Sequence, residues 1–330
     1  MNRERLRPLG LGDVFDEGFD LYKRNFTFLL LVGAAVLVPL DMLAAWVSPR
    51  LLPPIFAQFD VTTSKDDQFS VWAVTSLVRL TLFLPFYALA LCPLVLAASA
   101  RYLDKAATLA SVYGRTLKRL PSLIATVVLV GLTLDLSLLG CGVAWLLAAC
   151  QLFFTLPAAL IEGLGPGKAM KRSGALAGGY GGRVFSCLLV LGLISWVLSL
   201  GLWMPLAYVF GSVLNLTPGA DTLYGGGVPG AGGSAEQEVI SLLSRGLTHL
   251  FLTPFLVCVM TVLYYDLRIR KEGFDVEMLA QDLGYPALAA LGPHLPPVAA
   301  YGVMRPGAPL PIPPPGYAGP PPPGYGGPRR

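Results

Sequence analysis

Charge is scarce in this sequence. Charged residues make up 13% of its 330 residues, whereas a soluble domain usually carries about a quarter. So few charges cannot coat a water-exposed surface, which excludes a soluble enzyme as the main interpretation. Hydrophobic residues make up 54%, and the mean hydropathy is +0.63. They form long unbroken runs, not the short alternating stretches of a membrane barrel. An all-α integral membrane protein is therefore predicted.

Motifs for catalysis and metal binding are also lacking. The sequence has no G-x-x-x-x-G-K-[ST], no H-E-x-x-H and no G-x-S-x-G. Its two histidines, His249 and His294, cannot form a metal cluster by themselves. The five cysteines form no C-x-x-C and lie inside apolar runs, where they are interpreted as small packing residues. We therefore expect no enzyme activity, no cofactor and no metal, and nucleic acid is not an expected partner.

Long apolar runs are what the sequence does contain. A spanning helix needs about 20 mostly apolar residues. The forty-residue stretch from Ser122 to Ile161 holds two spans, because the polar break at Asp135, Ser137 and Gly140 provides a turn. The predicted spans are about 26–47, 71–100, 121–138, 142–161, 184–214 and 239–265. They form a membrane domain at 26–284, between an N-terminal segment at 1–25 and a tail at 285–330.

The positive charges are distributed asymmetrically. Of 24 Lys and Arg, 17 lie before the first span, in two alternate loops and just after the sixth span, whereas the other short loops carry only Arg50 and Lys65. Cytoplasmic loops carry the excess of Lys and Arg, so both termini are predicted to be cytoplasmic. The residues expected to anchor this side are Lys23, Arg24, Lys118, Arg119, Lys171, Arg172, Asp266, Arg268, Arg270 and Lys271.

Three polar but periodic segments each lead into an odd-numbered span. Their apolar residues recur at helical spacing. These stripes are Leu11, Val14, Phe15, Gly18, Phe19 and Tyr22; Ala106, Leu109, Ala110, Tyr113, Leu117 and Leu120; and Ala169, Ser173, Leu176, Ala177 and Tyr180. The pattern predicts three units, each a cytoplasmic amphipathic helix followed by a helical hairpin. Such helices lie in the headgroup layer, where anionic lipid attracts their basic ends, or pack against the spans from below.

Ionisable residues inside the spans form a second candidate site. Asp41, Arg79, Asp135 and Arg245 fall in one layer of the outer leaflet, and their charges cancel. Such residues are expensive in a membrane unless paired, so Asp41 or Asp135 is predicted to pair with Arg79 or Arg245. His249 lies one helical turn from Arg245. The layer is either a clamp that orders the bundle or a polar site for a headgroup or an ion, and a proton relay is a further alternative.

The charged run DLRIRKE (266–272) leaves the sixth span. It is predicted to pair with acidic residues of the first amphipathic segment, for example Asp16, Glu17 or Asp20. Asp266 is in turn expected to meet a base such as Lys171 or Arg172. Simple anchoring by positive charge is compatible with the same run.

The tail at 285–330 contains 15 Pro and 8 Gly in 46 positions. It ends in a tandem octapeptide, PPPGYAGP followed by PPPGYGGP, and is predicted to be disordered. The tandem spells P-P-G-Y twice, ending at Tyr317 and Tyr325, which matches a proline-motif ligand. The tail either binds a protein partner or is low-complexity sequence with no dedicated partner.

Two stretches resemble a known family: RPLGLGDVFDEGFDLYKRNFTFLL (7–30) and LYYDLRIRKEGFDVEMLAQDLG (263–284). Together with EGLGPGKAMKRSGALAGGYGGRVF (162–185), they are similar to the bacterial glycerophosphoryl diester phosphodiesterase membrane-domain family. The resemblance covers roughly 7–284 and implies a multi-span domain of the bacterial inner membrane. The catalytic barrel of some members has no room here, so the phosphodiesterase activity is not carried over.

The function predicted from these features is a non-enzymatic membrane module that organises or regulates membrane lipids or membrane partners. The alternative is a transporter or permease-like protein for a small or lipidic solute. A water-filled cavity reaching Arg79, Arg245 or His249 favours the alternative, and a tightly packed bundle favours the module.

Overall fold

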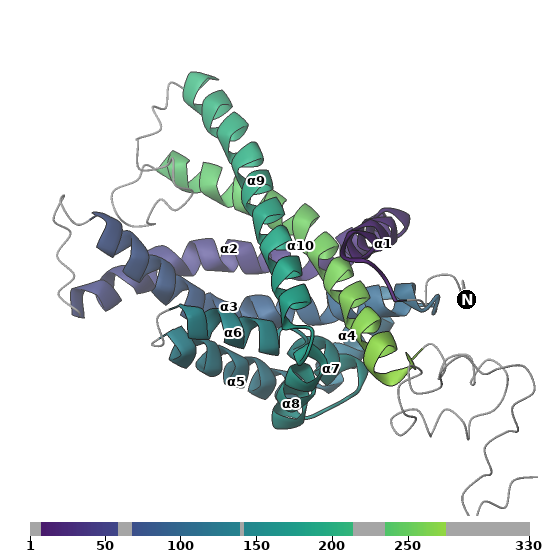
Figure 1. The fold of residues 1–330 in the computed structure, drawn as a ribbon. Coiled ribbons are helices and arrows are strands. Elements are labelled where there is room, and N and C mark those ends of the chain that lie inside the picture. Colours follow the sequence, from purple (N-terminus) through teal and green to yellow (C-terminus); the bar gives the residue numbers. More distant parts are fainter. Residues whose placement is uncertain (1–7, 59–67, 139–141, 214–234, 275–330) are drawn as a thin grey trace, which may run out of the picture.

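The computed structural model of the protein describes residues 8–58, 68–138, 142–213 and 235–274. Across these ranges it contains ten helices and no strand (Figure 1), which confirms the predicted all-α class. The helices are α1 (Leu11–Arg24), α2 (Phe26–Gln58), α3 (Gln68–Tyr102), α4 (Leu109–Lys118), α5 (Leu120–Leu138), α6 (Val143–Leu152), α7 (Thr155–Ile161), α8 (Pro166–Ala177), α9 (Gly181–Val213) and α10 (Ala235–Glu272). The proline-rich tail and its P-P-G-Y repeats lie outside the described residues.

Six segments are long and apolar enough to cross a membrane, as predicted, so the chain is a multi-pass membrane protein. They are Phe26–Ala44, Pro85–Tyr102, Leu120–Ser137, Val143–Ile161, Gly181–Leu202 and Gly246–Glu272. The sixth continues past the predicted end at Tyr265 and includes the whole charged run. Its charges are compatible with this position because they pair with charged or carbonyl groups of neighbouring elements.

The fourth span is broken near its middle, between α6 and α7. Pro157 lies in the first turn of α7 and has no backbone N–H to donate. Ser173 of α8 meets the break: its hydroxyl accepts a hydrogen bond from the backbone N–H of Phe154 at 3.0 Å and donates one to the carbonyl of Gln151 at 2.5 Å. Ser173 is fully buried. It satisfies backbone groups that an unbroken helix would pair internally, which apolar surroundings require.

Replacing Ser173 by alanine is expected to destabilise the protein by about 1–3 kcal/mol, because Phe154 N–H and the Gln151 carbonyl lose a buried partner. Unfolding by SDS titration, followed by circular dichroism, measures the change. Ser195→Ala on α9 is the matched control, since the Ser195 hydroxyl bonds the Leu191 carbonyl within its own helix. Equal effects of the two substitutions would contradict the role assigned to Ser173.

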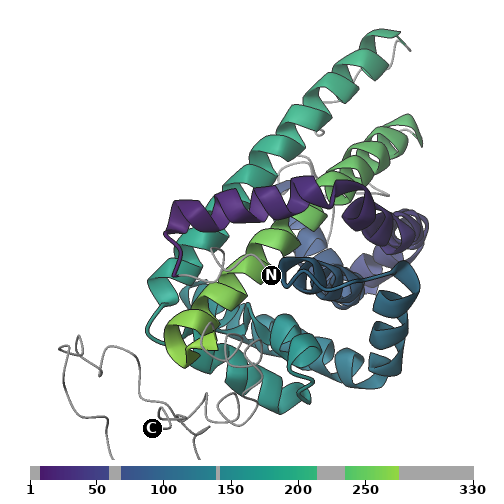
Figure 2. The same cartoon turned by 90° about the vertical axis from the view of Figure 1, so that its right-hand side faces the viewer.

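α10 is the central element of the bundle. It packs against α1, α2, α3, α8 and α9, and α1 crosses it in Figure 2. Tyr264 and Tyr265 of α10 are fully buried, and the Tyr265 hydroxyl lies 2.7 Å from that of Ser99 on α3. At the crossing of α1, a Cβ on Gly18 would lie 2.7 Å from Val259 Cγ2. Only glycine therefore allows α1 to approach α10 this closely.

The buried faces of α1, α4 and α8 agree only partly with the predicted stripes. α8 buries Ala169, Ser173, Leu176 and Ala177, as predicted. α1 buries Val14 and Gly18 as predicted and also Leu21, whereas Phe19 is 49% exposed. α4 buries Val112 and Thr116, which are not part of its predicted stripe, and leaves Leu109 and Leu117 of the stripe exposed. α4 has apolar residues on two sides, and periodicity by itself does not say which side meets the bundle.

Candidate functional site

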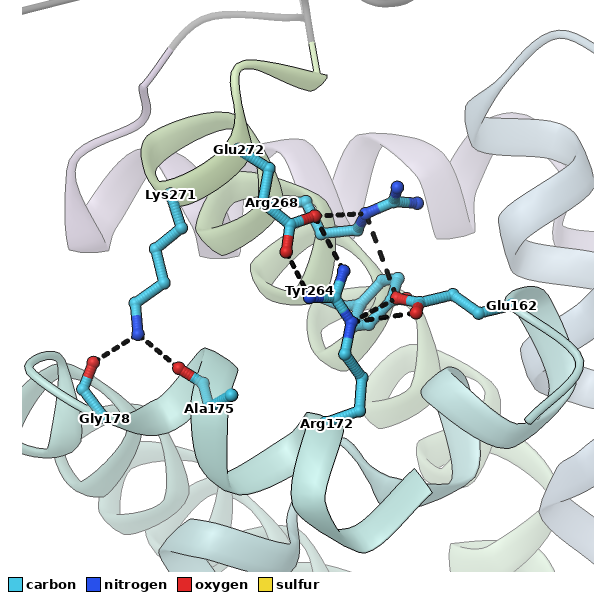
Figure 3. Close-up of polar contacts among 8 residues, drawn as sticks. All are labelled: Glu162, Arg172, Ala175, Gly178, Tyr264, Arg268, Lys271 and Glu272. Carbon is cyan, nitrogen blue, oxygen red and sulfur yellow. Dashed lines mark hydrogen bonds and ion pairs between the residues drawn. The ribbon is translucent and has the colours of Figure 1, made fainter. Parts of the chain in front are cut away.

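The first site lies at what we call the basic end of the bundle, which carries α4, α8 and the last turns of α10. Its centre is Arg172 of α8, which binds two carboxylates at once (Figure 3). Arg172 Nε donates to both carboxylate oxygens of Glu162, at 2.9 and 2.8 Å. Its Nη2 donates to Glu272 Oε2 at 2.7 Å, and its Nη1 donates to Glu272 Oε1. Arg172 thereby ties α8 to both the end of α7 and the end of α10.

Two residues of α10 complete this group. Arg268 Nε donates to Glu272 Oε2 at 3.2 Å and lies 4.0 Å from Glu162 Oε1. The Tyr264 hydroxyl donates to Glu162 Oε1 at 2.5 Å. We call Glu162, Arg172, Tyr264, Arg268 and Glu272 the Arg172 cluster. Two bases and two acids cancel in charge, as a partly buried ionic group must.

Electrostatics keep Arg172 charged. Burial opposes its charged form, but the hydrogen bonds that Arg172 donates to Glu272 and Glu162 outweigh burial and raise the pKa of the Arg172 guanidinium above its ordinary value. Beside the cluster, Lys271 Nζ donates to the carbonyls of Ala175 and Gly178 at the C-terminus of α8. A cation in this position also interacts favourably with the helix dipole.

A second group lies on the opposite side of α10 and centres on Asp266, which is fully buried. Asp266 accepts hydrogen bonds from the backbone N–H of Leu9 at 2.8 Å and from Arg270 Nε at 3.1 Å, and its Oδ2 lies 3.0 Å from Arg183 Nη2. Arg183 and Arg270 both also donate to the Leu9 carbonyl. We call Leu9, Arg183, Asp266 and Arg270 the Asp266 cluster. It fixes the segment before α1 to the start of α9 and the end of α10.

Asp266 thus meets a base, as predicted, but that base is Arg183 and not Lys171 or Arg172. Residues two apart on a helix point in different directions, whereas residues four apart share a face. Asp266 and Arg270 share one face of α10, which is turned toward Leu9. Arg268 and Glu272 share the other, which α8 meets through Arg172. The sequence showed the run of charges but not which face of α10 would meet α8.

The remaining predicted anchor residues lie nearer the surface. Arg24 forms an exposed ion pair with Asp20 on α1 at 3.3 Å, and Lys23 Nζ lies 5.3 Å from the centre of the Phe19 ring. Arg119 Nη1 donates to the Ala159 carbonyl of α7 at 3.4 Å. Lys118 and Lys171 are exposed. Asp16 and Glu17, which were predicted to pair with the charged run 266–272, lie on α1 near Asp20. Their pairing with that run stays a prediction.

Sequence reasoning missed Glu162 and Tyr264 as members of an ionic cluster, and it used Arg183 only as a positive charge. A signal for Glu162 was present: it directly follows the fourth span and is the acid nearest to the bases of 168–172. Tyr264 lies within an apolar run and carried no signal. The backbone of Leu9 carried no signal either, because its role depends on where the segment before α1 lies relative to α9 and α10.

The second candidate site lies at the other ends of three spans. Asp41 of α2 is 4% exposed. Tyr87 of α3 donates its hydroxyl to Asp41 Oδ1 at 2.5 Å. His249 Nδ1 of α10 lies 2.9 Å from Asp41 Oδ1 and 3.1 Å from Oδ2. The Tyr87 and His249 rings meet edge to face, with centroids 5.1 Å apart. The structure thus brings together two residues of the predicted layer and adds Tyr87, which the sequence analysis missed.

The predicted pairing of Asp41 or Asp135 with Arg79 or Arg245 is not tested by the described residues. Asp135 lies half-buried on α5. Arg79 and Arg245 lie within α3 and α10, but their side chains are outside the described part of the structure. A pair between either base and Asp41 or Asp135 stays a prediction. The observed partners of Asp41 are His249 and Tyr87.

Within the described ranges, no group of three or more His, Cys, Asp or Glu residues could hold a metal ion. The cysteines of these ranges, Cys92, Cys150, Cys187 and Cys258, are free and buried. Their surroundings are those of packing residues.

Comparison with known proteins adds no relative. No family model matches the chain, and no curated protein and no solved structure matches it either. The resemblance to the glycerophosphoryl diester phosphodiesterase membrane domain therefore stays a prediction.

Proposed function

We propose that the protein is a non-enzymatic membrane module that organises anionic lipids, and partners gathered on them, at its basic end. The observation that carries the proposal is the outward face of α4. α4 buries Val112 and Thr116, while Leu117 is 63% exposed and the bases Arg115 and Lys118, which share a face, are also exposed. The helix contains no acidic residue. An apolar strip next to a basic strip is the surface that a helix presents to a leaflet of anionic lipid.

The rest of the basic end supports this function by being fixed in place. The Arg172 cluster joins α7, α8 and α10, and the Asp266 cluster joins the segment before α1 to α9 and α10. α4 is itself tied to α2, because the Tyr113 hydroxyl donates to the Val32 carbonyl at 2.6 Å. We further propose that the chain consists of three units, each an amphipathic helix followed by a hairpin, in the bacterial inner membrane with cytoplasmic termini, as the distribution of Lys and Arg favours.

Replacing Arg115 and Lys118 by glutamine is expected to lower the enrichment of anionic lipid on the purified protein several-fold, since each base near a charged leaflet contributes about 1 kcal/mol. The full chain is reconstituted in equal phosphatidylglycerol and phosphatidylcholine and re-extracted. Native mass spectrometry then counts the retained lipids. Leu117→Ser should weaken retention of both lipids.

The matched control is Lys23→Gln with Arg24→Gln, which removes the same charge from α1. It should change the lipid ratio much less than the α4 pair does. Equal losses from the two double variants would show a general effect of net charge and would contradict the assignment to α4.

A second function is favoured by one observation. The Asp41, Tyr87 and His249 group is a polar site inside the bundle, as a transporter or permease for a small or lipidic solute requires. Solute flux in proteoliposomes that His249→Gln or Arg79→Ala abolishes would support transport. Retained lipid without flux would support the lipid-organising module.

A further inference from the structure

The Asp41, Tyr87 and His249 group has a property that neither lipid contact nor packing of the basic end requires. It places the carboxylate of Asp41, which is 4% exposed, between three membrane-spanning segments. A charged side chain within a membrane-spanning segment is expensive, and such residues mark functional sites. Asp41 lies three residues before the end of its span, and His249 lies three residues after the start of its own.

Hydrogen bonding decides the state of the imidazole ring. A carboxylate only accepts hydrogen bonds, so His249 Nδ1, at 2.9 and 3.1 Å from the two oxygens of Asp41, carries a hydrogen. The other ring nitrogen, Nε2, is then the atom that gains or loses a proton. His249 is 30% exposed at its side chain, whereas Asp41 is enclosed. The ring is therefore the part of the group that a proton reaches from outside.

Charge balance decides how many protons the group holds. With neutral His249 and a neutral Tyr87 hydroxyl, the group carries the single negative charge of Asp41. One proton added at Nε2 gives an imidazolium beside a carboxylate, and the net charge becomes zero. The apolar spans favour the neutral sum.

The titratable groups around His249 come from several helices. α2 contributes Asp41 and α3 contributes Tyr87. From α1, the Tyr22 hydroxyl donates to the carbonyl of Phe251, two residues beyond His249. The bases of α8 and α9 that meet α10, in the Arg172 and Asp266 clusters, do so at the opposite end. On α10 itself Arg245 lies one turn before His249, with its side chain outside the described residues.

We propose that Asp41, Tyr87 and His249 form an intramembrane proton-binding site, in which His249 takes up one proton at Nε2 and Asp41 remains the counter-ion. No other bond forms or breaks. Tyr87 is a positioning residue that holds the Asp41 carboxylate toward the ring.

Prolines make the surrounding helices able to respond to this proton. Pro39 in α2, Pro85 in α3 and Pro254 in α10 each remove a backbone donor near the site. Pro254 also lies where α2 and α10 approach closely, since a Cβ on Gly33 would be 3.4 Å from its ring. Proton binding is thus placed among segments that bend more easily than continuous helices.

Nitrogen NMR of the full chain in nanodiscs tests the proposal. His294→Gln leaves His249 as the single histidine, and labelled imidazole reports its protonation between pH 5 and pH 8. The expected result is an imidazolium signal that forms within this pH range. Asp41→Asn should lower the imidazolium fraction at the upper end of the range by about tenfold or more, as loss of an opposite charge in contact does. Tyr87→Phe should lower it less.

Two outcomes overturn the proposal. The first is a ring that stays neutral down to pH 5 in the otherwise native chain, a measurement that does not depend on how Asp41→Asn folds. The second is an imidazolium that appears only in Arg245→Gln, which would show that Arg245 balances Asp41. The α4 lipid variants should leave the histidine spectrum unchanged, so this test and that of the proposed function fail independently.

Discussion

Replacing Asp266 by alanine is expected to destabilise the protein more than any other single change considered, by about 3–5 kcal/mol, because removing one partner of a buried ionic group leaves the others uncompensated. Arg183 and Arg270 would face each other without the carboxylate between them. The Leu9 N–H would lose its acceptor at 2.8 Å. SDS-titrated unfolding of the full chain, followed by circular dichroism, measures the loss.

Two further variants make this prediction specific. Asp20→Ala removes an acid from an exposed pair with Arg24 on α1, and it should change stability by less than about 1 kcal/mol. Asp266→Asn keeps an acceptor for the Leu9 N–H but removes the charge, so it should fall between the two. An Asp266→Ala protein as stable as Asp20→Ala would rule out the proposed role of the Asp266 cluster as a joint between α1, α9 and α10.

Replacing Arg172 by alanine is expected to have the second largest effect, about 2–4 kcal/mol. Loss of the guanidinium leaves the carboxylates of Glu162 and Glu272 with Arg268 as their shared base. We expect a smaller loss of stability than for Asp266→Ala because the side chains of Arg172, Glu162 and Glu272 are 18–25% exposed. Water therefore screens part of the repulsion between the two carboxylates. The same unfolding titration gives the size of the change.

A double-mutant cycle shows whether the cluster acts as a unit. Glu272→Gln in the Arg172→Ala background removes the repulsion, so the double variant should be less destabilised than the sum of the single ones. Lys171→Ala, next to Arg172 but exposed, is the matched control and should be nearly neutral. Additive effects of the Arg172 and Glu272 changes would contradict the proposed cluster.

The two clusters and the proton site share one helix. α10 carries His249 near one end of its span and the Tyr264–Glu272 segment at the other. Ionic contacts on two faces fix the latter end to α8, to α9 and to the segment before α1. The His249 end meets α2 and α3, where prolines interrupt the backbone hydrogen bonding. A change in the charge of His249 is therefore expected to move the end of the bundle that contains His249 and to leave the basic end in place.

The sequence predicted those features whose physical cause is local in the chain. Each span could be predicted because burial in lipid requires a continuous apolar run, which is local in the chain. The turn before Val143 was readable because polar residues and glycine interrupt such a run. Counting residues along the spans placed Asp41 at the level of Arg245, one helical turn from His249. Tyr87 was not found, because a tyrosine in a span shows no partner until two other helices are placed beside it.

Other features depended on which surfaces meet. α4 has apolar residues on both sides, and only its packing shows that Val112 faces inward and Leu117 outward. Asp266 and Glu272 belong to one charged run, but their different directions from α10 give them different partners. Ser173 reads as part of a helical stripe, and its bond to the broken backbone at Phe154 depends on how deeply α8 sits against α6 and α7.

The sequence by itself determined that this is an all-α protein with six spans and a basic end, because hydrophobic length and charge position are properties of the chain taken in order. The tertiary structure decided which charges pair, which side of α4 remains free and that Asp41 meets His249. The physical reason is that an ion pair or a buried hydrogen bond depends on distances of a few ångströms between residues far apart in sequence, such as the 208 positions that separate Asp41 and His249.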